Sequence, residues 1–214
     1  MDALRDKWSD WFAREEGSAG LAGILSTKES FLYAAAAAAV VAGSTALDSF
    51  VTYREKRQKG GEGVKQGNGS INEATSPATD SWYRSLRKPW YHPPNWVFPA
   101  VWIPLKVLQT GALYLLWTTE DVSLYKKAAA TGLYLVHVGL GTLWNRLFFG
   151  KHKIRKSLYA MTGFCTTLAG TIGVFWTINP KAAIMLAPTQ VWATIAALLN
   201  YQSWALNPEM DVDG

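Results

Sequence analysis

Five long apolar segments limit the folds that are open to this chain of 214 residues. A helix needs about 20 mostly apolar residues to cross the hydrocarbon core of a bilayer. The segments of about this length lie at residues 31–52, 97–117, 128–149, 158–178 and 182–206. Charged residues make up 17% of the chain and concentrate between these segments. The pattern predicts an all-α integral membrane protein, a bundle of five transmembrane helices within residues 31–207.

A soluble helical bundle is the alternative interpretation of this pattern. The helices of a soluble bundle show a polar stripe that repeats every 3.6 residues. The segment at 158–178 has no such stripe, because its polar side chains are small threonines. The short polar connections between the later segments favour helices that cross the membrane as antiparallel neighbours. We therefore expect a multi-pass protein whose first partner is the lipid bilayer.

The N-terminal tail, residues 1–30, precedes the first apolar segment. It holds six acidic and four basic residues and no apolar core, which is not the pattern of a signal or transit peptide. Leu4, Trp8, Trp11 and Phe12 would share one face of a helix. This spacing predicts a short amphipathic helix at the membrane interface, and a frayed tail is the alternative.

The polar connections indicate how the spans are oriented. Residues 54–80 are rich in Gly, Asn and Ser and predict a flexible loop, and residues 208–214 form an acidic C-terminal tail. The connections after the first and third spans, counted together with Arg146 near the end of the third span, carry 13 Lys and Arg residues, whereas the N-terminal tail and the other two connections carry 7. Basic residues of membrane proteins concentrate on the cytosolic side of the membrane. We therefore expect the side with more basic residues, which includes the C-terminus, to face the cytosol.

Several functional classes are not indicated by the sequence. The basic residues flank apolar segments and do not alternate with exposed aromatic residues, so no nucleic-acid partner is expected. The single cysteine, Cys165, excludes an intramolecular disulfide. The chain lacks CxxC, HExxH, GxSxG and phosphate-binding glycine motifs, so enzyme chemistry of the soluble type and a dedicated metal site are not expected. His92 lies in a proline-rich turn without a neighbouring ligand pattern.

Two ionisable residues lie deep inside the predicted spans. Lys106 is near the middle of the second span and needs a partner, a watery cavity or an anionic ligand, although snorkelling is the alternative. His137, in the third span, could ligate haem iron, but a lone histidine more often forms ordinary hydrogen bonds.

Tryptophans from three spans suggest a binding pocket. Trp102, Trp144 and Trp192 lie in the second, third and fifth spans. If they converge, they form a flat apolar pocket with a few donors, which suits a planar ring system. Helix packing or interfacial anchoring is the alternative role for such residues.

A longer motif resembles a known family. The stretch WYRSLRKPWYHPPNWVFPAVWIPL is similar to the signature of the tryptophan-rich sensory protein, or translocator protein, family. The matching residues are Trp82, Tyr83, Leu86, Lys88, Pro89, Pro93, Pro94, Trp96, Phe98 and Trp102. The stretches Leu143–Gly150 and Ala187–Asn207 agree with the same family, so that the resemblance covers residues 81–207 closely.

This resemblance implies five transmembrane helices, often in a homodimer, with the first loop covering a pocket. It implies binding of haem, porphyrins and, in animals, sterols, with no obligatory cofactor. The proposed activities are transport or sensing of tetrapyrroles and, for some members, light-dependent porphyrin degradation. The location implied for a eukaryotic member is the mitochondrial outer membrane or a membrane of the ER and secretory pathway.

The resemblance also suggests site residues. The expected ligand-binding residues are Trp102, Lys106, His137, Gly141, Trp144, Asn145, Trp192 and Ala196, and the expected loop or gate residues are Trp82, Lys88, Pro93, Pro94 and Trp96. Lys106 stands where the family usually has an aromatic residue, His137 where Gln is frequent, and Gly141 where Asn is common. No basic residue follows Tyr201, which argues against sterol binding of the animal type.

The leading hypothesis is a membrane receptor or carrier for a tetrapyrrole. The tryptophans would stack on the ring, and Lys106 would offer a cation to a propionate. The alternatives are an enzyme-like porphyrin degradation under light, and a scaffold that recruits partners through its basic loops.

Overall fold

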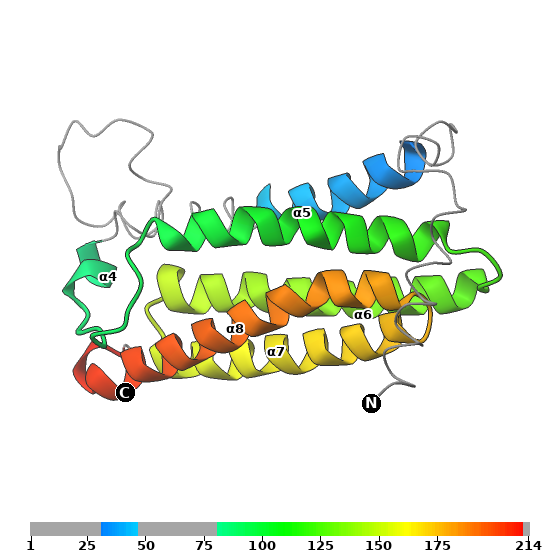
Figure 1. Ribbon diagram of the computed structural model, residues 1–214. Helices are drawn as coiled ribbons and strands as arrows, with labels where there is room; N and C mark the ends of the chain where they lie inside the picture. The colour runs from blue at the N-terminus through cyan, green and yellow to red at the C-terminus, as the bar shows by residue number, and fades with distance from the viewer. Residues whose placement is uncertain (1–30, 47–80, 212–214) are drawn as a thin grey trace, which may run out of the picture.

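The computed structural model describes residues 31–46 and 81–211 of the chain (Figure 1). Every regular element in these ranges is a helix, so the predicted all-α fold is confirmed. The elements are an apolar helix at Phe31–Ala46, α4 (Ser81–Ser85), α5 (Val97–Thr118), α6 (Leu124–Asn145), the π-helix η2 (Arg146–Gly150), α7 (Ile154–Trp176), α8 (Pro180–Leu206) and the 3-10 helix η3 (Pro208–Met210). The predicted amphipathic helix, the loop at 54–80 and the end of the first span lie outside the described residues.

Local sequence signals start two of the long helices. Ser123 caps α6 by accepting a hydrogen bond from the backbone N–H of Lys126, at 3.3 Å. Asn179 caps α8 by accepting from two backbone N–H groups, and Pro180 follows it at the first helical position. A proline is favourable there because the first N–H groups of a helix have no partner within the helix. Capping therefore fixes the first residues of α6 and α8, directly after the short connections that precede them.

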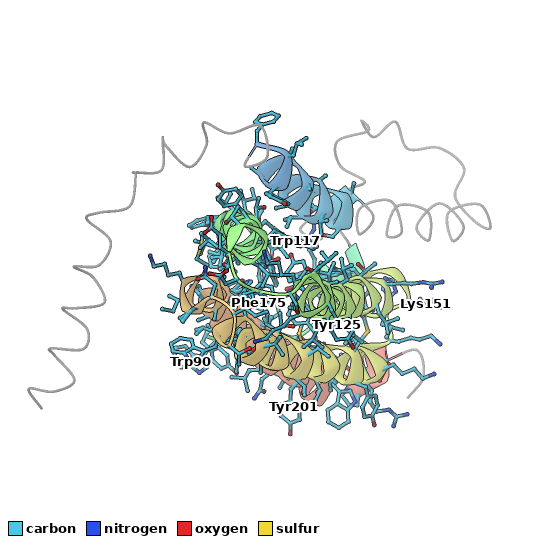
Figure 2. All side chains as sticks on the ribbon, turned by 90° about the vertical axis from the view of Figure 1, so that its right-hand side faces the viewer. Trp90, Trp117, Tyr125, Lys151, Phe175 and Tyr201 are labelled. Carbon is cyan, nitrogen blue, oxygen red and sulfur yellow. The ribbon has the colours of Figure 1, made fainter. Side chains whose placement is uncertain are left out.

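The long helices form a bundle in which α7 packs against both α6 and α8, while α5 packs mainly against α8. Figure 2 views the bundle along its helices and shows Phe175 inside it, with Trp90 and Tyr201 pointing outwards. The core between the helices is apolar and includes Tyr134, Leu168, Phe175, Leu186 and Ala193, all fully buried. Helices α5 and α6 make few contacts with each other, and this seam is where the cavity described below is found.

The described helices differ in how clearly they qualify as membrane spans. Three of them, α5, α7 and α8, are long and apolar enough to cross a bilayer. The helix at Phe31–Ala46 is apolar but shorter in its described part, and α6 is less apolar because it carries polar residues such as Lys126, Lys127 and His137. Large apolar side chains such as Val107, at 67% exposure, lie on the outside of the bundle, as expected for a surface that faces lipid.

The described part of the C-terminal tail folds back onto the bundle. The Asn207 side chain accepts a hydrogen bond from the backbone N–H of Arg87 at 2.7 Å and donates one to its carbonyl at 2.9 Å. Asp211 accepts from the backbone N–H groups of Ile154 and Arg155, both at 3.1 Å. Residues 207–211 therefore join the segment after α4 to the start of α7 at one end of the bundle.

Candidate functional site

A cavity of about 470 Å³ lies in the seam between α5 and α6. The walls come from α5, α6, η2, α7 and α8, with Thr45 of the first helix at one side. Tyr83, His92 and Asn95, from α4 and the turn before α5, line the end of the cavity that lies against α4, which we term the mouth. Most of the lining is apolar or aromatic, with a few polar groups between, which is typical of small-molecule sites.

Seven of the eight predicted ligand-binding residues line this cavity. They are Trp102 and Lys106 on α5, His137, Gly141, Trp144 and Asn145 on α6, and Ala196 on α8. Trp192 is not among the lining residues. It lies against Phe98, which does line the cavity, in an edge contact with ring centroids 5.8 Å apart. Two of the three tryptophans therefore line the cavity, whereas Trp192 packs behind a wall residue, and its contact with a ligand stays a prediction.

The predicted gate residues lie beside the mouth, outside the cavity lining. Trp82 stacks on His152 with ring centroids 4.1 Å apart, and Trp96 is 69% exposed. Lys88 folds back onto Tyr83, donating a hydrogen bond to its backbone carbonyl at 2.7 Å. Neither Pro93 nor Pro94 lines the cavity, although both belong to the turn that holds His92 and Asn95 at the mouth.

The mouth contains a hydrogen bond that the sequence does not suggest. The hydroxyl of Tyr83 lies 2.8 Å from Nε2 of His92. Burial, and secondarily the charge of Lys88, hold the pKa of His92 below its usual range, and burial raises the pKa of Tyr83 to about 12. Near neutral pH both groups are therefore uncharged, and the tautomer of the His92 ring sets which of the two donates. The sequence-based interpretation of His92 as a turn residue without a functional role omitted its place in the cavity wall.

Lys106 is the one formally charged side chain among the described lining residues. Its Nζ donates a hydrogen bond to Oγ of Ser44, at 3.3 Å, on the Phe31–Ala46 helix. An ammonium group has three N–H donors, so a bound anion can join this contact. Among the lining residues that the structure describes, Lys106 thus contributes the positive charge of the cavity wall.

A chain of buried hydrogen bonds stands behind the wall near Lys106. Gln109 donates to Thr189 on α8 at 3.2 Å and accepts from the Tyr134 hydroxyl on α6 at 3.0 Å. Gln109 lines the cavity, while Thr189 and Tyr134 are fully buried. Because unpaired polar groups are costly in a lipid-exposed bundle, this chain fixes the relative positions of three helices.

A second buried network holds Trp144 in the wall. The indole N–H of Trp144 donates to Oδ1 of Asn200 at 2.8 Å, and the Ser157 hydroxyl donates to the same oxygen at 2.9 Å. Asn200 in turn donates to the backbone carbonyl of Ile154 at 3.4 Å. The orientation of the Trp144 ring is therefore determined by side chains on α7 and α8.

A missing side chain at Gly141 makes room for an aromatic wall residue. A Cβ at this position would lie 3.0 Å from the Phe164 ring, closer than side chains normally approach. Phe164 lines the cavity together with Phe148 and Phe149 of the π-helix η2. Sequence reasoning missed these phenylalanines, because aromatic residues in an apolar span give no sign of which face they occupy. A π-helix is often found at functional sites, but its five residues leave no clear sequence signal.

Tyr201, the residue of the sterol motif considered from sequence, lies away from the cavity. It is 50% exposed and points outwards from α8 (Figure 2). No group of three or more His, Cys, Asp or Glu residues that could hold a bare metal ion occurs within residues 31–46 and 81–211. The cavity is thus suited to a flat apolar molecule that carries an acidic group, held by stacking and one cation.

The chain is similar to known proteins over most of its described length. The sequence profile of the TspO/MBR family matches residues 64–205. Protein CrtK of Rhodobacter capsulatus is 31% identical over 130 residues, which cover 60% of this chain and 79% of that protein. The translocator protein of Ovis aries is 32% identical over 128 residues, 59% of this chain and 75% of that protein. The tryptophan-rich protein TspO of Archaeoglobus fulgidus is 29% identical over 138 residues, 62% and 84% respectively.

Proposed function

The chain belongs to the TspO/MBR family of integral membrane proteins, and from this premise we propose that it is a receptor or carrier for a tetrapyrrole, haem or a porphyrin. The names of its relatives, a translocator protein and a tryptophan-rich sensory protein, refer to movement and sensing. The observation that carries the proposal is the aromatic cavity between α5 and α6, with one lysine in its wall.

The shape and lining of the cavity favour a flat, largely apolar ligand. Its volume of about 470 Å³ falls within the range of small-molecule sites, about 300–1,000 Å³. Trp102 and Trp144 approach it from two different helices, and Phe148 and Phe149 complete an aromatic wall. Aromatic rings stack favourably on a planar conjugated ring, and their burial adds hydrophobic stabilisation.

Lys106 gives the cavity a preference for acidic ligands. A porphyrin carries propionates, and a carboxylate placed among apolar walls needs a positive partner. The Lys106 ammonium lies in the wall and is already oriented by Ser44. A charged hydrogen bond of this kind contributes roughly 1.5–3 kcal/mol, which corresponds to about 10-fold to 100-fold in affinity.

Binding of protoporphyrin IX and haem to the protein in lipid nanodiscs tests this function. We expect Trp102→Ala to weaken both ligands, and Trp90→Ala, at a position 96% exposed, to leave them unchanged. We expect Lys106→Phe to weaken the free acids but not protoporphyrin dimethyl ester, which has no carboxylate. Wild-type protein that binds neither ligand would overturn the proposed function, and unchanged affinity in Lys106→Phe would overturn the role of the lysine.

Light-dependent porphyrin degradation is the second candidate, because two oxidisable indoles, those of Trp102 and Trp144, line the cavity. Its test is the appearance of ring-opened products under illumination in the presence of oxygen. If the protein degrades porphyrin, Trp102→Phe or Trp144→Phe should retain binding and abolish the products. If porphyrin is degraded as fast in protein-free nanodiscs as with the wild-type protein or the variants, the protein does not catalyse degradation, and binding is its only proposed role.

A further inference from the structure

The three histidines of the chain occupy very different places. His152 stacks on Trp82 and is not a lining residue of the cavity. His92 lines the mouth, but its Nε2 is engaged by the Tyr83 hydroxyl at 2.8 Å. His137 lines the cavity from α6 and is almost fully buried, at 1% exposure. Of the three histidines, His137 is therefore the one whose imidazole a ligand inside the cavity could contact.

One ring nitrogen of His137 already takes part in a hydrogen bond. Its Nδ1 lies 3.0 Å from the backbone carbonyl oxygen of Tyr134. A carbonyl oxygen can only accept, so Nδ1 carries the proton. In the neutral ring Nε2 then bears the lone pair, and it has no hydrogen-bond partner within the part of the chain that the structure describes. Nε2 is thus the ring nitrogen left for a ligand.

The surroundings of His137 hold the ring still. Its centroid lies 5.0 Å from that of Tyr134 and 4.7 Å from that of Phe164. The hydroxyl of Tyr134 is itself bonded to Gln109, so the neighbouring ring is held as well. A histidine that ligates a metal commonly donates its other N–H to a carbonyl, which fixes the tautomer and makes the ligating nitrogen more basic. The geometry of His137 is that of such a ligand.

We propose that Nε2 of His137 is the axial ligand of the iron of a haem bound in this cavity. The inference rests on the proposed tetrapyrrole-binding function and names the metal-bearing ligand of the same site. A haem iron needs only one protein ligand, so the lack of a three-residue metal cluster in the described chain is no obstacle. The Nε2 lone pair forms the Fe–N bond and displaces a weakly held water from the iron, and no proton or electron is transferred.

Iron ligation predicts a difference between haem and metal-free protoporphyrin IX. Stacking and the contact with Lys106 serve both ligands, whereas the Fe–N bond serves haem alone. In nanodiscs, we expect His137→Gln to weaken ferric haem at least 10-fold, to abolish the optical and EPR signature of imidazole-ligated haem, and to change protoporphyrin affinity less than 2-fold. His152→Gln is the matched control, and it should leave both affinities and the signature unchanged.

A second measurement does not depend on the folding of His137→Gln. The double variant His92→Gln/His152→Gln, purified without a histidine tag, keeps His137 as its only histidine. Ferrous haem in this protein should show an iron–histidine stretching band in resonance Raman spectra, and labelling with ¹⁵N-histidine should shift the band. Absence of the band in this double variant would overturn the assignment. Failure of wild-type protein to bind protoporphyrin IX would instead count against the proposed function.

Discussion

Single side chains decide which atoms the cavity presents. Asn200 is the clearest case, because it accepts from Trp144 and Ser157 through one oxygen and donates to the carbonyl of Ile154. Asn200 is nearly fully buried between helices. Its loss would leave the indole N–H of Trp144 without its partner in a low-dielectric region, which costs roughly 1–3 kcal/mol. The position of the Trp144 ring in the wall depends on this one amide.

We predict that Asn200→Leu lowers the thermal stability of the protein and weakens porphyrin binding. The destabilisation should be about 1–3 kcal/mol, because a buried donor loses its acceptor. The measurement is the melting temperature in detergent together with a porphyrin titration. Thr194→Val is the control, since the Thr194 hydroxyl is exposed and bonds only within its own helix, to the Gln190 carbonyl. Equal melting temperatures for the two variants would contradict the role of Asn200.

The burial of His92, together with the nearby charge of Lys88, predicts a pH dependence of stability. The pKa of His92 is lowered in the folded protein, below the value of 6.5 for an ordinary histidine. The unfolded chain therefore binds more protons as pH falls through and below 6.5, and the folded state loses stability over that window. We expect His92→Gln to flatten this part of the profile, measured by thermal unfolding between pH 7.5 and about 5. An unchanged slope would show that another group is responsible.

At the scale of elements, the start of α7 depends on residues far away in the chain. Lys153, at the N-cap position of α7, does not cap the helix with its side chain, unlike Ser123 and Asn179 at the starts of α6 and α8. The carboxylate of Asp211 caps α7 instead, through the backbone N–H groups of Ile154 and Arg155. A negative charge at a helix N-terminus is also favourable for the helix dipole. The C-terminal tail is therefore part of the folded bundle.

We predict that Asp211→Ala destabilises the protein by about 0.5–2 kcal/mol, the usual cost of losing a helix cap. Glu209→Ala is the control two residues away. Glu209 pairs with Arg87 at 3.3 Å, but both side chains are more than half exposed, so removing this pair should cost much less. Chemical or thermal unfolding in the same detergent gives the comparison. If Glu209→Ala is as harmful as Asp211→Ala, the capping role of Asp211 is wrong.

At the scale of the whole molecule, charge is distributed unequally between the two ends. The end with α4, the α6–α7 connection and the C-terminus is joined by the contacts of Asn207 and Asp211 (Figure 1). Its described basic residues are Arg84, Arg87, Lys88, Arg146, Lys151, Lys153, Arg155 and Lys156. The described basic residues of the opposite end are Lys126, Lys127 and Lys181. From the positive-inside rule we predict that the first end faces the cytosol.

This orientation can be measured with single cysteines in a Cys165→Ser background. We expect Glu209→Cys to react with a membrane-impermeant maleimide from the cytosolic side of sealed vesicles. Lys126→Cys, at the opposite end, should react only from the other side. The reverse pattern would show that the charge difference does not set the topology of this protein.

The sequence by itself determined the class of protein, because the length of each apolar segment can be counted directly from the order of residues. It also predicted seven lining residues, since family motifs mark positions such as Trp102 and Ala196 directly. It did not predict that Trp192 would pack against Phe98, that Tyr83 would bond to His92, or that Asp211 would cap α7. Helices that are apolar on nearly all sides carry no polar stripe to report their rotation. Only tertiary packing sets those rotations, and with them which of many aromatic side chains form the cavity wall.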